Sequence, residues 1–311
     1  MQWQKTPSPK KMSSVPLLLI TAGVLSACAS IPTVKRTAIS PQEACPVTTA
    51  ITGEHFSPRG SLQITTYNLR GIKDHAGLKS DLAELASTHV FAFQEVVSPR
   101  ASCHLPEELL AILPAGTWHV FNYPLNAVRG GFESQIIASR HPIATTSIIP
   151  LAHHGVKNRV ALVAEINTPS GAVVVVNTDH ESGFWKGVGY NHRRHQLESL
   201  RAGIEIIDPA KPIVLTGDFN TYGNLLQRPF LGPRSEISAT RAFIERMGFK
   251  AASTVGPTFR SLFVSLTLDH FFVRMLPNPS SSKLKKRIGS DHYPITIIFD
   301  LTADEKVPHR R

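Results

Sequence analysis

The segment I-V-L-T-G-D-F-N, residues 213–220, places two polar side chains directly after a short apolar run. Residues 213–216 are apolar or β-branched, which predicts a buried strand. Asp218 and Asn220 are two positions apart, so in an extended chain their side chains point to the same face. Because functional side chains are often held at the rim of a rigid sheet, the segment predicts a site there.

The same arrangement recurs elsewhere in the chain. Predicted strands at 62–67 and 90–93 are followed by Asn68 and by Gln94-Glu95, and the polar groups L-D-H at 268–270 and G-S-D-H-Y-P at 289–294 precede apolar runs. A hard cation such as Mg²⁺ prefers oxygen ligands and needs few from the protein. Glu95, with Asp291 or Asn68, would suffice, so the pattern predicts a metal site along one sheet edge.

Strands outnumber helices in the predicted secondary structure. Eight apolar runs predict strands, at residues 62–67, 90–93, 135–138, 161–166, 172–176, 213–216, 268–273 and 295–299. Three segments have the apolar spacing of helices, at residues 78–86, 191–207 and 237–247. Strands with interspersed helices indicate a layered α/β or α+β fold.

The composition is that of a folded protein with one large core, with 311 residues, 42% hydrophobic and 18% charged. Disordered and collagen-like classes are thereby excluded. Lys and Arg outnumber Asp and Glu by 33 to 23, the formal net charge is +10 and the pI is about 9.7. Without Lys5, Lys10 and Lys11 of the leader, the balance is 30 to 23, or +7. Such a surface favours polyanionic partners.

The N-terminus has the organisation of an export signal. Three lysines within residues 1–14 precede an apolar run at 15–27, which is shorter than the roughly 20 residues that span a bilayer. The run ends in L-S-A-C and resembles the lipobox of bacterial lipoproteins, which predicts a signal peptide at 1–27 and a diacylated Cys28. Ala29 after it favours the outer membrane, so we expect a lipid-anchored protein of the cell envelope. The alternative is a general secretory signal with a coincidental cysteine.

The rest of the chain predicts one domain behind a tether. Residues 28–59 contain several Pro, Thr and Ser without a sustained apolar period and predict a membrane tether. The domain is expected at 60–302, as a monomer, and residues 303–311 predict a polar tail. Cys45 and Cys103 form either one disulfide or two buried thiols.

Five motifs in order resemble the endonuclease/exonuclease/phosphatase superfamily, in its deoxyribonuclease/sphingomyelinase-like branch. They are T-Y-N-L-R at 66–70, F-Q-E-V at 93–96, G-D-F-N at 217–220, L-D-H-F-F-V at 268–273 and S-D-H-Y-P-I at 290–295. The resemblance spans about residues 61–301. It implies an α/β fold, a four-layer αββα sandwich of two packed mixed β-sheets flanked by helices. It also implies a metal-dependent phosphoric ester hydrolase, in which water attacks a phosphodiester with the help of Mg²⁺, or of Mn²⁺ or Ca²⁺.

The resemblance also implies roles for the motif residues. Glu95 would be the principal metal ligand, with Asn68 and Asp291 beside it. In the catalytic set, Asp218 would orient or deprotonate the attacking water and Asn220 would hold the water or a phosphate oxygen. His292, with Asp269 accepting its other ring proton, would stabilise or protonate the phosphate.

One motif departs from the family pattern. A segment like N-T-H-L-E-S is usual there, whereas residues 177–182 read N-T-D-H-E-S, so Asp179 occupies the position of the histidine and His180 follows it. Strand parity turns these two side chains to opposite faces. We favour His180 as the catalytic, phosphate-facing group because a phosphate attracts a cation. The alternative is that Asp179 serves as a further ligand.

Three functions are compatible with the sequence. An exported nuclease is favoured by the basic charge, with Arg129, Lys186, Arg193 and Arg194 as candidates to line the site. A phospholipase of the sphingomyelinase or phosphoinositide phosphatase kind, acting on a phospholipid head group, is favoured by the anchor and by the apolar residues 184–185. A non-catalytic binding lipoprotein is the third. The motif G-x-x-x-x-G-K-S/T is absent and so is G-x-S-x-G, which disfavours nucleotide-driven and serine esterase functions.

Overall fold

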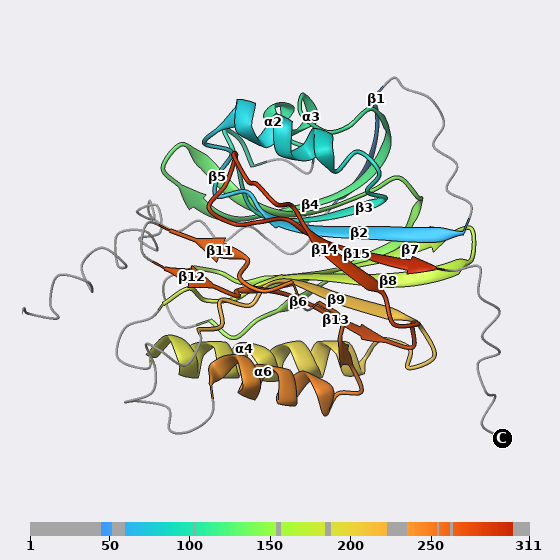
Figure 1. Ribbon diagram of the computed structural model, residues 1–311, viewed down its shortest axis with the longest axis vertical. Helices are drawn as coiled ribbons and strands as arrows, with labels where there is room; N and C mark the ends of the chain where they lie inside the picture. The colour runs from blue at the N-terminus through green and yellow to red at the C-terminus, as the bar shows by residue number, and fades with distance from the viewer. Residues whose placement is uncertain are drawn as a thin grey trace, which may run out of the picture.

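The chain folds into four layers, two facing β-sheets with helices on both outer sides (Figure 1). The computed structural model describes residues 45–51, 60–101, 104–153, 157–183, 188–222, 235–253, 255–261 and 264–300. Helices α2 (His75–Glu84) and α3 (Glu107–Leu110) cover the first sheet, and α4 (Val188–Glu205) and α6 (Glu236–Glu245) cover the second. The expected α/β sandwich of two mixed sheets is therefore confirmed.

Both sheets mix parallel and antiparallel pairs. The first has the order β1-β4-β5-β3-β2-β15-β14, with bounds β1 Cys45–Ile51, β4 Gly116–Val128, β5 Gly131–Ser139, β3 Val90–Ser98, β2 Ser61–Asn68, β15 Ile295–Asp300 and β14 Ser280–Lys283. The second has the order β10-β13-β9-β8-β7-β6, with bounds β10 Lys250–Ala251, β13 Asp269–Arg274, β9 Ile213–Asp218, β8 Gly171–Asp179, β7 Val160–Thr168 and β6 Ile143–Pro150. A small hairpin pairs β11 (Phe259–Arg260) with β12 (Ser265–Leu266).

Three buried apolar clusters join the four layers. The central one lies between the sheets and includes Ile64, Leu162 and Phe271, while the outer two pack α2 and α3 on the first sheet and α4 and α6 on the second. Asn177 also crosses from β8 to the first sheet, where its Nδ2 donates to the carbonyls of Phe93 and Ile136 at 2.9 and 3.1 Å. This buried link holds the two sheets at a fixed spacing near the strand ends that carry the motifs.

The structure extends the predicted elements and corrects one boundary. All eight predicted strands and three helices are present, whereas α3 and the strands β1, β4, β6, β10, β11, β12 and β14 were not predicted. Residues 45–51 were assigned to the tether but form β1, which pairs antiparallel with β4 from Cys45–Asn122 to Ile51–Gly116. An edge strand needs only backbone pairing, so a polar, Pro- and Thr-containing segment can form one without an apolar period.

Several predictions fall outside the described residues. These are the signal peptide, the lipidated Cys28, the Cys45–Cys103 disulfide, the apolar residues 184–185 and the tail at 303–311. Within the described residues, no helix has the length and apolar character needed to cross a membrane.

Candidate active site

Three aspartates stand side by side on neighbouring strands of the second sheet. Asp179 on β8 pairs in register with Asp218 on β9, and Asp218 pairs in register with Asp269 on β13. Paired positions share one face of a sheet. That face is turned toward the first sheet, because Asn68 Nδ2 on β2 donates to Asp218 Oδ2 at 3.0 Å. The fold therefore collects carboxylates from three separate motifs into one row.

Asp218 lies at the centre of the row and is buried. Its Oδ1 accepts from the backbone N–H of Asn220 at 2.8 Å, and His292 Nε2 lies 3.7 Å from its Oδ2. Burial raises the pKa of Asp218 to about 7; the charge of Asp269 adds to this rise and that of His292 opposes it. A carboxylate that titrates near neutral pH can accept a proton from water at neutral pH.

His292 is held at one end of the row by Asp269. Its Nδ1 lies 2.9 Å from Asp269 Oδ2, and its ring centroid lies 5.1 Å from that of Phe259 on the small hairpin. Burial by itself lowers the pKa of His292, but the charge and hydrogen bond of Asp269 outweigh it and raise the pKa to about 10. The ring is therefore charged at neutral pH, with Nδ1 committed to Asp269 and Nε2 directed to the row as a proton donor.

The ligand atoms of Asp218, Asp269 and His292 lie within 4.8 Å of one another, a spacing that a metal ion could also use. The hydrogen bond between His292 and Asp269 favours an acid–base role for this group, and Glu95, Asn68 and Asp291 are the metal ligands predicted from the sequence.

Glu95 is the carboxylate best suited to a metal. It lies in a bulge of β3, where the register with β5 shifts between Phe93 and Val96, and its φ is 50°. Left-handed backbone is costly for glutamate and is often retained at functional positions. Its charge raises the pKa of both Asp179 and Asp218, which places it at the same rim. Its carboxylate has no hydrogen bond or ion pair with another described residue.

The other two predicted ligands lie beside it but already have protein partners. Asn68 Oδ1 accepts from the backbone N–H of Arg70 at 3.0 Å. Asp291 forms an ion pair with Arg70 Nη1 at 2.9 Å. Ser290 Oγ donates to the carbonyl of Asn68 at 2.8 Å, which fastens the last motif to the first. The structure thus brings the first and last motifs together, although they are more than 200 residues apart.

Asn220 follows Asp218 with a φ of 49°, a conformation that asparagine tolerates better than most residues. Its backbone N–H binds Asp218, and its Nδ2 donates to the carbonyl of His180 at 2.9 Å. Asn220 was expected to hold the attacking water or a phosphate oxygen, whereas its Nδ2 here fixes the end of β8. In this structure, Asn220 is a positioning residue for Asp218.

The expectation that His180 faces the phosphate is corrected by the structure. Its ring is buried at a centroid distance of 5.0 Å from Phe219, its Nε2 has no hydrogen-bond partner among the described residues, and burial lowers its pKa to about 3. A neutral, enclosed imidazole lacks the positive charge on which that expectation was based. Asp179 is the residue that joins the row, because β8 continues through it and strand parity turns His180 away.

The partner of Asp179 is Arg159, which the sequence did not single out. Arg159 Nη1 forms a buried ion pair with Asp179 Oδ2. Desolvation lowers the pKa of Arg159, but Asp179 and other acids outweigh it, while burial raises the pKa of Asp179 despite Arg159. Lys157 Nζ and Glu133 Oε2 form a second buried pair, at 2.6 Å. The row of aspartates is thus bounded by two cations, Arg159 at one end and His292 at the other.

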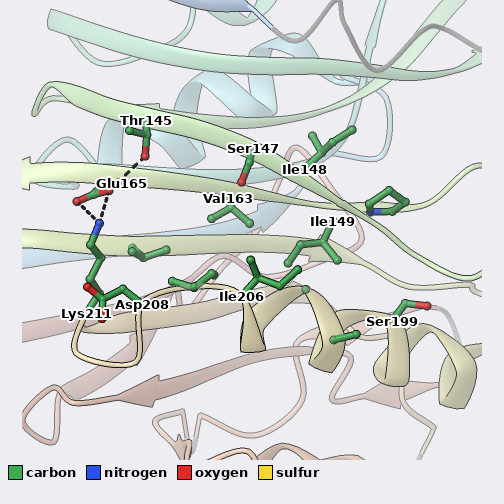
Figure 2. A pocket seen from close by; sticks show the side chains of 15 residues that line it. Thr145, Ser147, Ile148, Ile149, Val163, Glu165, Ser199, Ile206, Asp208 and Lys211 are labelled. Carbon is green, nitrogen blue, oxygen red and sulfur yellow. Dashed lines mark hydrogen bonds and ion pairs between the residues drawn. The ribbon is translucent and has the colours of Figure 1, made fainter.

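Arg193 and a hollow beside α4 both lie outside this site. Arg193, a candidate polyanion contact, is buried and donates to both oxygens of Glu236 at 2.5 and 3.0 Å. It therefore joins α4 to α6. A hollow of about 710 Å³ lies between α4 and the β6–β8 side of the second sheet, where Lys211 pairs with Glu165 at its rim (Figure 2). It contains none of the motif residues.

Gly217 should be sensitive to substitution because it passes close to β8. Its φ is +134°, and a Cβ there would lie 1.9 Å from the carbonyl oxygen of Thr178. We expect Gly217→Ala to destabilise the fold by roughly 3 kcal/mol or more, measured by urea unfolding, because the strand must move. Gly171 is the matched control, since its φ of +122° is similar but its Cβ would meet nothing within 4 Å. Equal losses in the two variants would contradict the close approach.

Comparisons with known proteins agree with this geometry. The sequence model of the Endonuclease/Exonuclease/phosphatase family matches residues 65–292, most of the chain. Among relatives, YbhP of Escherichia coli (strain K12) is 25% identical over 184 residues, which cover 58% of this chain and 68% of YbhP.

Many solved structures share the fold, among them the following two. The endonuclease/exonuclease/phosphatase protein of Beutenbergia cavernae has a TM-score of 0.60 at 19% identity, covering 78% of this chain and 72% of that one. TDP2 of D. rerio, solved with a single-strand DNA product, has a TM-score of 0.55 at 16% identity and covers 77% and 98%.

Proposed function

Because this chain belongs to the endonuclease/exonuclease/phosphatase family, whose members are generally hydrolases of phosphoester bonds, we propose that it is an exported nuclease. The observation that carries the proposal is the pairing of Asp218 with His292 and Asp269 in one buried row. Export rests on the leader, and cell fractionation would test it, because the protein should be found in the envelope and not in the cytosol.

The row supplies a base and an acid for hydrolysis of a phosphodiester. Asp218, with a pKa near neutrality, takes a proton from water as the water oxygen forms its bond to phosphorus. As the bond from phosphorus to the leaving oxygen breaks, the Nε2 proton of His292 passes to that oxygen. Asp269 holds the His292 ring and balances its charge throughout.

The donor set of the rim fits a divalent cation. Glu95 is a carboxylate close to Asp179 and Asp218 without an ion-pair partner in the described part of the chain, and a cation such as Mg²⁺ or Mn²⁺ prefers oxygen ligands of this kind. Glu95 would hold the ion, with Asn68 beside it, while Asp291 would have to exchange Arg70 for it. When bound, the ion supplies a positive charge that neutralises the charge developing on the phosphate.

Nucleic acid is the substrate that the available observations favour. The formal charge is +10 for the whole chain, and polyanions bind such surfaces by releasing counterions. A structural neighbour, TDP2 of D. rerio, was solved with a single-strand DNA product, which supports a DNA strand as the first substrate to test. A phospholipid head group is the second candidate, because the expected lipid anchor would hold the site at a membrane.

We expect the full-length protein to cleave single-stranded DNA and bis-p-nitrophenyl phosphate with Mg²⁺ and to stop when EDTA is added. In Glu95→Gln, half-maximal activity should require at least about ten-fold more Mg²⁺, because a charged ligand is lost. Glu84→Gln is the matched control, since Glu84 is an exposed residue of α2. Steady-state rates over a Mg²⁺ titration provide the measurement.

The other outcomes are equally informative. Cleavage of sphingomyelin without cleavage of DNA would replace the nuclease by a phospholipase. A folded protein that binds Mg²⁺ but cleaves none of the three substrates would indicate a binding lipoprotein. Identical Mg²⁺ dependence in Glu95→Gln and the wild type would remove Glu95 from the metal site.

A further inference from the structure

A group of five cations lies directly beside the acid–base row, on the segment that leads into S-D-H at 290–292 and on the small hairpin. Its members, called here the basic tract, are Arg260, Lys283, Lys285, Lys286 and Arg287. Arg260, Lys285 and Lys286 are exposed, and the other two are half-buried. Among the described residues, none of the five forms an ion pair with a carboxylate.

The tract is fixed to the catalytic segment by backbone contacts. Arg287 donates through Nη1 to the carbonyl of Ser290 and through Nη2 to the carbonyl of Arg260. The backbone N–H of Arg260 donates in turn to the carbonyl of Asp291 at 3.0 Å. Phe259, the preceding residue, forms a β-bridge with His292. The hairpin, the tract and the proton donor therefore form one connected unit.

The position of the tract is also fixed from behind. The buried carboxylate of Asp81 accepts the backbone N–H groups of Ile288 and Gly289, and a Cβ on Gly289 would lie 2.3 Å from the backbone nitrogen of Leu78 on α2. Asp291 is the acidic residue nearest in sequence to Arg287, and its carboxylate already forms an ion pair with Arg70. The exposed cations Arg260, Lys285 and Lys286 consequently lie on a rigid support without a carboxylate partner among the described residues, and an anionic ligand would relieve their mutual repulsion.

The side chains of the patch favour a nucleic-acid strand over a membrane surface as its anionic partner. Lys283 Nζ lies 4.6 Å and the Arg287 guanidinium 5.1 Å from the ring centroid of Tyr293, so the patch alternates cations with an aromatic ring. Single strands bind surfaces that combine cations with aromatic rings, through phosphate charge and ring contacts. A membrane site needs exposed apolar side chains as well, and Ile288 is the one large exposed hydrophobic residue described in this segment.

We infer that the basic tract binds the phosphate backbone of a single nucleic-acid strand and guides it into the site beside His292. The inference rests on the proposed nuclease function, and it specifies where on the protein the substrate strand binds. It predicts that the tract contacts the phosphates that flank the scissile bond of a nucleic-acid strand. A small diester such as bis-p-nitrophenyl phosphate has no flanking phosphates, so its hydrolysis should not depend on the tract.

The test compares two double variants that each remove two positive charges. Lys285→Ser/Lys286→Ser removes the exposed lysines of the tract, and Arg246→Ser/Lys250→Ser removes an exposed pair at the end of α6 and on β10, in the other sheet. Binding of a labelled single-stranded oligonucleotide is followed by fluorescence anisotropy in EDTA over a range of salt concentrations. This measurement does not depend on catalysis, so it stands even if the proposed hydrolysis fails.

We expect the tract variant to bind about ten-fold or more weakly at low salt. The slope of log Kd against log salt should fall by about 1.4, since each neutralised phosphate of a single strand contributes about 0.7. The control variant should bind like the wild type, and Lys285→Arg/Lys286→Arg should retain binding because it keeps both charges. Hydrolysis of bis-p-nitrophenyl phosphate should be unchanged in every variant.

Three results would overturn the inference. Equal weakening in both Ser variants would mean that net charge, and not the tract, binds DNA. Unchanged DNA binding with lost binding to vesicles containing phosphatidylserine would assign the tract to a membrane surface. A loss of small-diester hydrolysis as large as the loss on DNA would mean that the lysines act on the reacting centre itself.

Discussion

In Asp218→Asn, kcat for bis-p-nitrophenyl phosphate should fall by about 10²- to 10⁴-fold, the range expected when a general base is removed. The two side chains have the same shape, and the amide can still accept the backbone N–H of Asn220 through its oxygen. What is lost is the ability to take the proton of the attacking water. Rates at saturating substrate and Mg²⁺ measure the effect, with the exposed Asp208→Asn as the matched control.

The same variant should be more stable than the wild type in alkaline solution. The pKa of Asp218 rises to about 7 on folding from a usual value of 3.8, so the folded protein binds the proton more tightly. Its contribution to stability is complete below about pH 4 and is lost as the pH rises through 7. Urea unfolding at pH 8 should therefore favour the asparagine variant, with a smaller difference at pH 5. A variant that is less active and also less stable at pH 8 would point to a structural role.

Arg159→Met should destabilise the protein by about 3 to 5 kcal/mol, because it leaves Asp179 buried without its cation. Both side chains of this pair are almost fully inaccessible, so water cannot replace the lost partner. Urea unfolding at pH 8 is the measurement, since burial raises the pKa of Asp179 and a lower pH would favour its protonation and reduce the cost. Methionine keeps the length and much of the volume of the stem, so the loss reports on charge more than on packing.

Two further variants isolate the charge effect. Arg159→Met/Asp179→Leu removes both charges and should recover part of the lost stability, which a double-mutant cycle quantifies. Arg201→Met, in the exposed pair with Glu198 at 3.1 Å, should cost much less stability than Arg159→Met, because water screens the exposed charges. If Arg159→Met costs no more than Arg201→Met, the buried pair is not a significant source of stability.

The sequence predicted the elements of the fold well because their signals are local. Alternation of apolar residues placed the strands at 62–67 and 213–216, and both were found with bounds extended by one or two residues. The two longest strands that were missed lack that alternation. β4 is buried along most of its length, and β6 is largely accessible, so neither has the half-buried pattern that identifies a strand.

The sequence by itself determined the family and the order of the motifs, and it predicted Glu95, Asp218, Asp269 and His292 as candidate site residues, since each is marked by its immediate neighbours. The tertiary structure alone decided which side chains meet. It placed Asp179 beside Asp218, enclosed His180 against Phe219 and brought Arg159 to Asp179. Register, burial and charge act between residues distant in the chain, and these interactions set the pKa values on which the proposed chemistry depends.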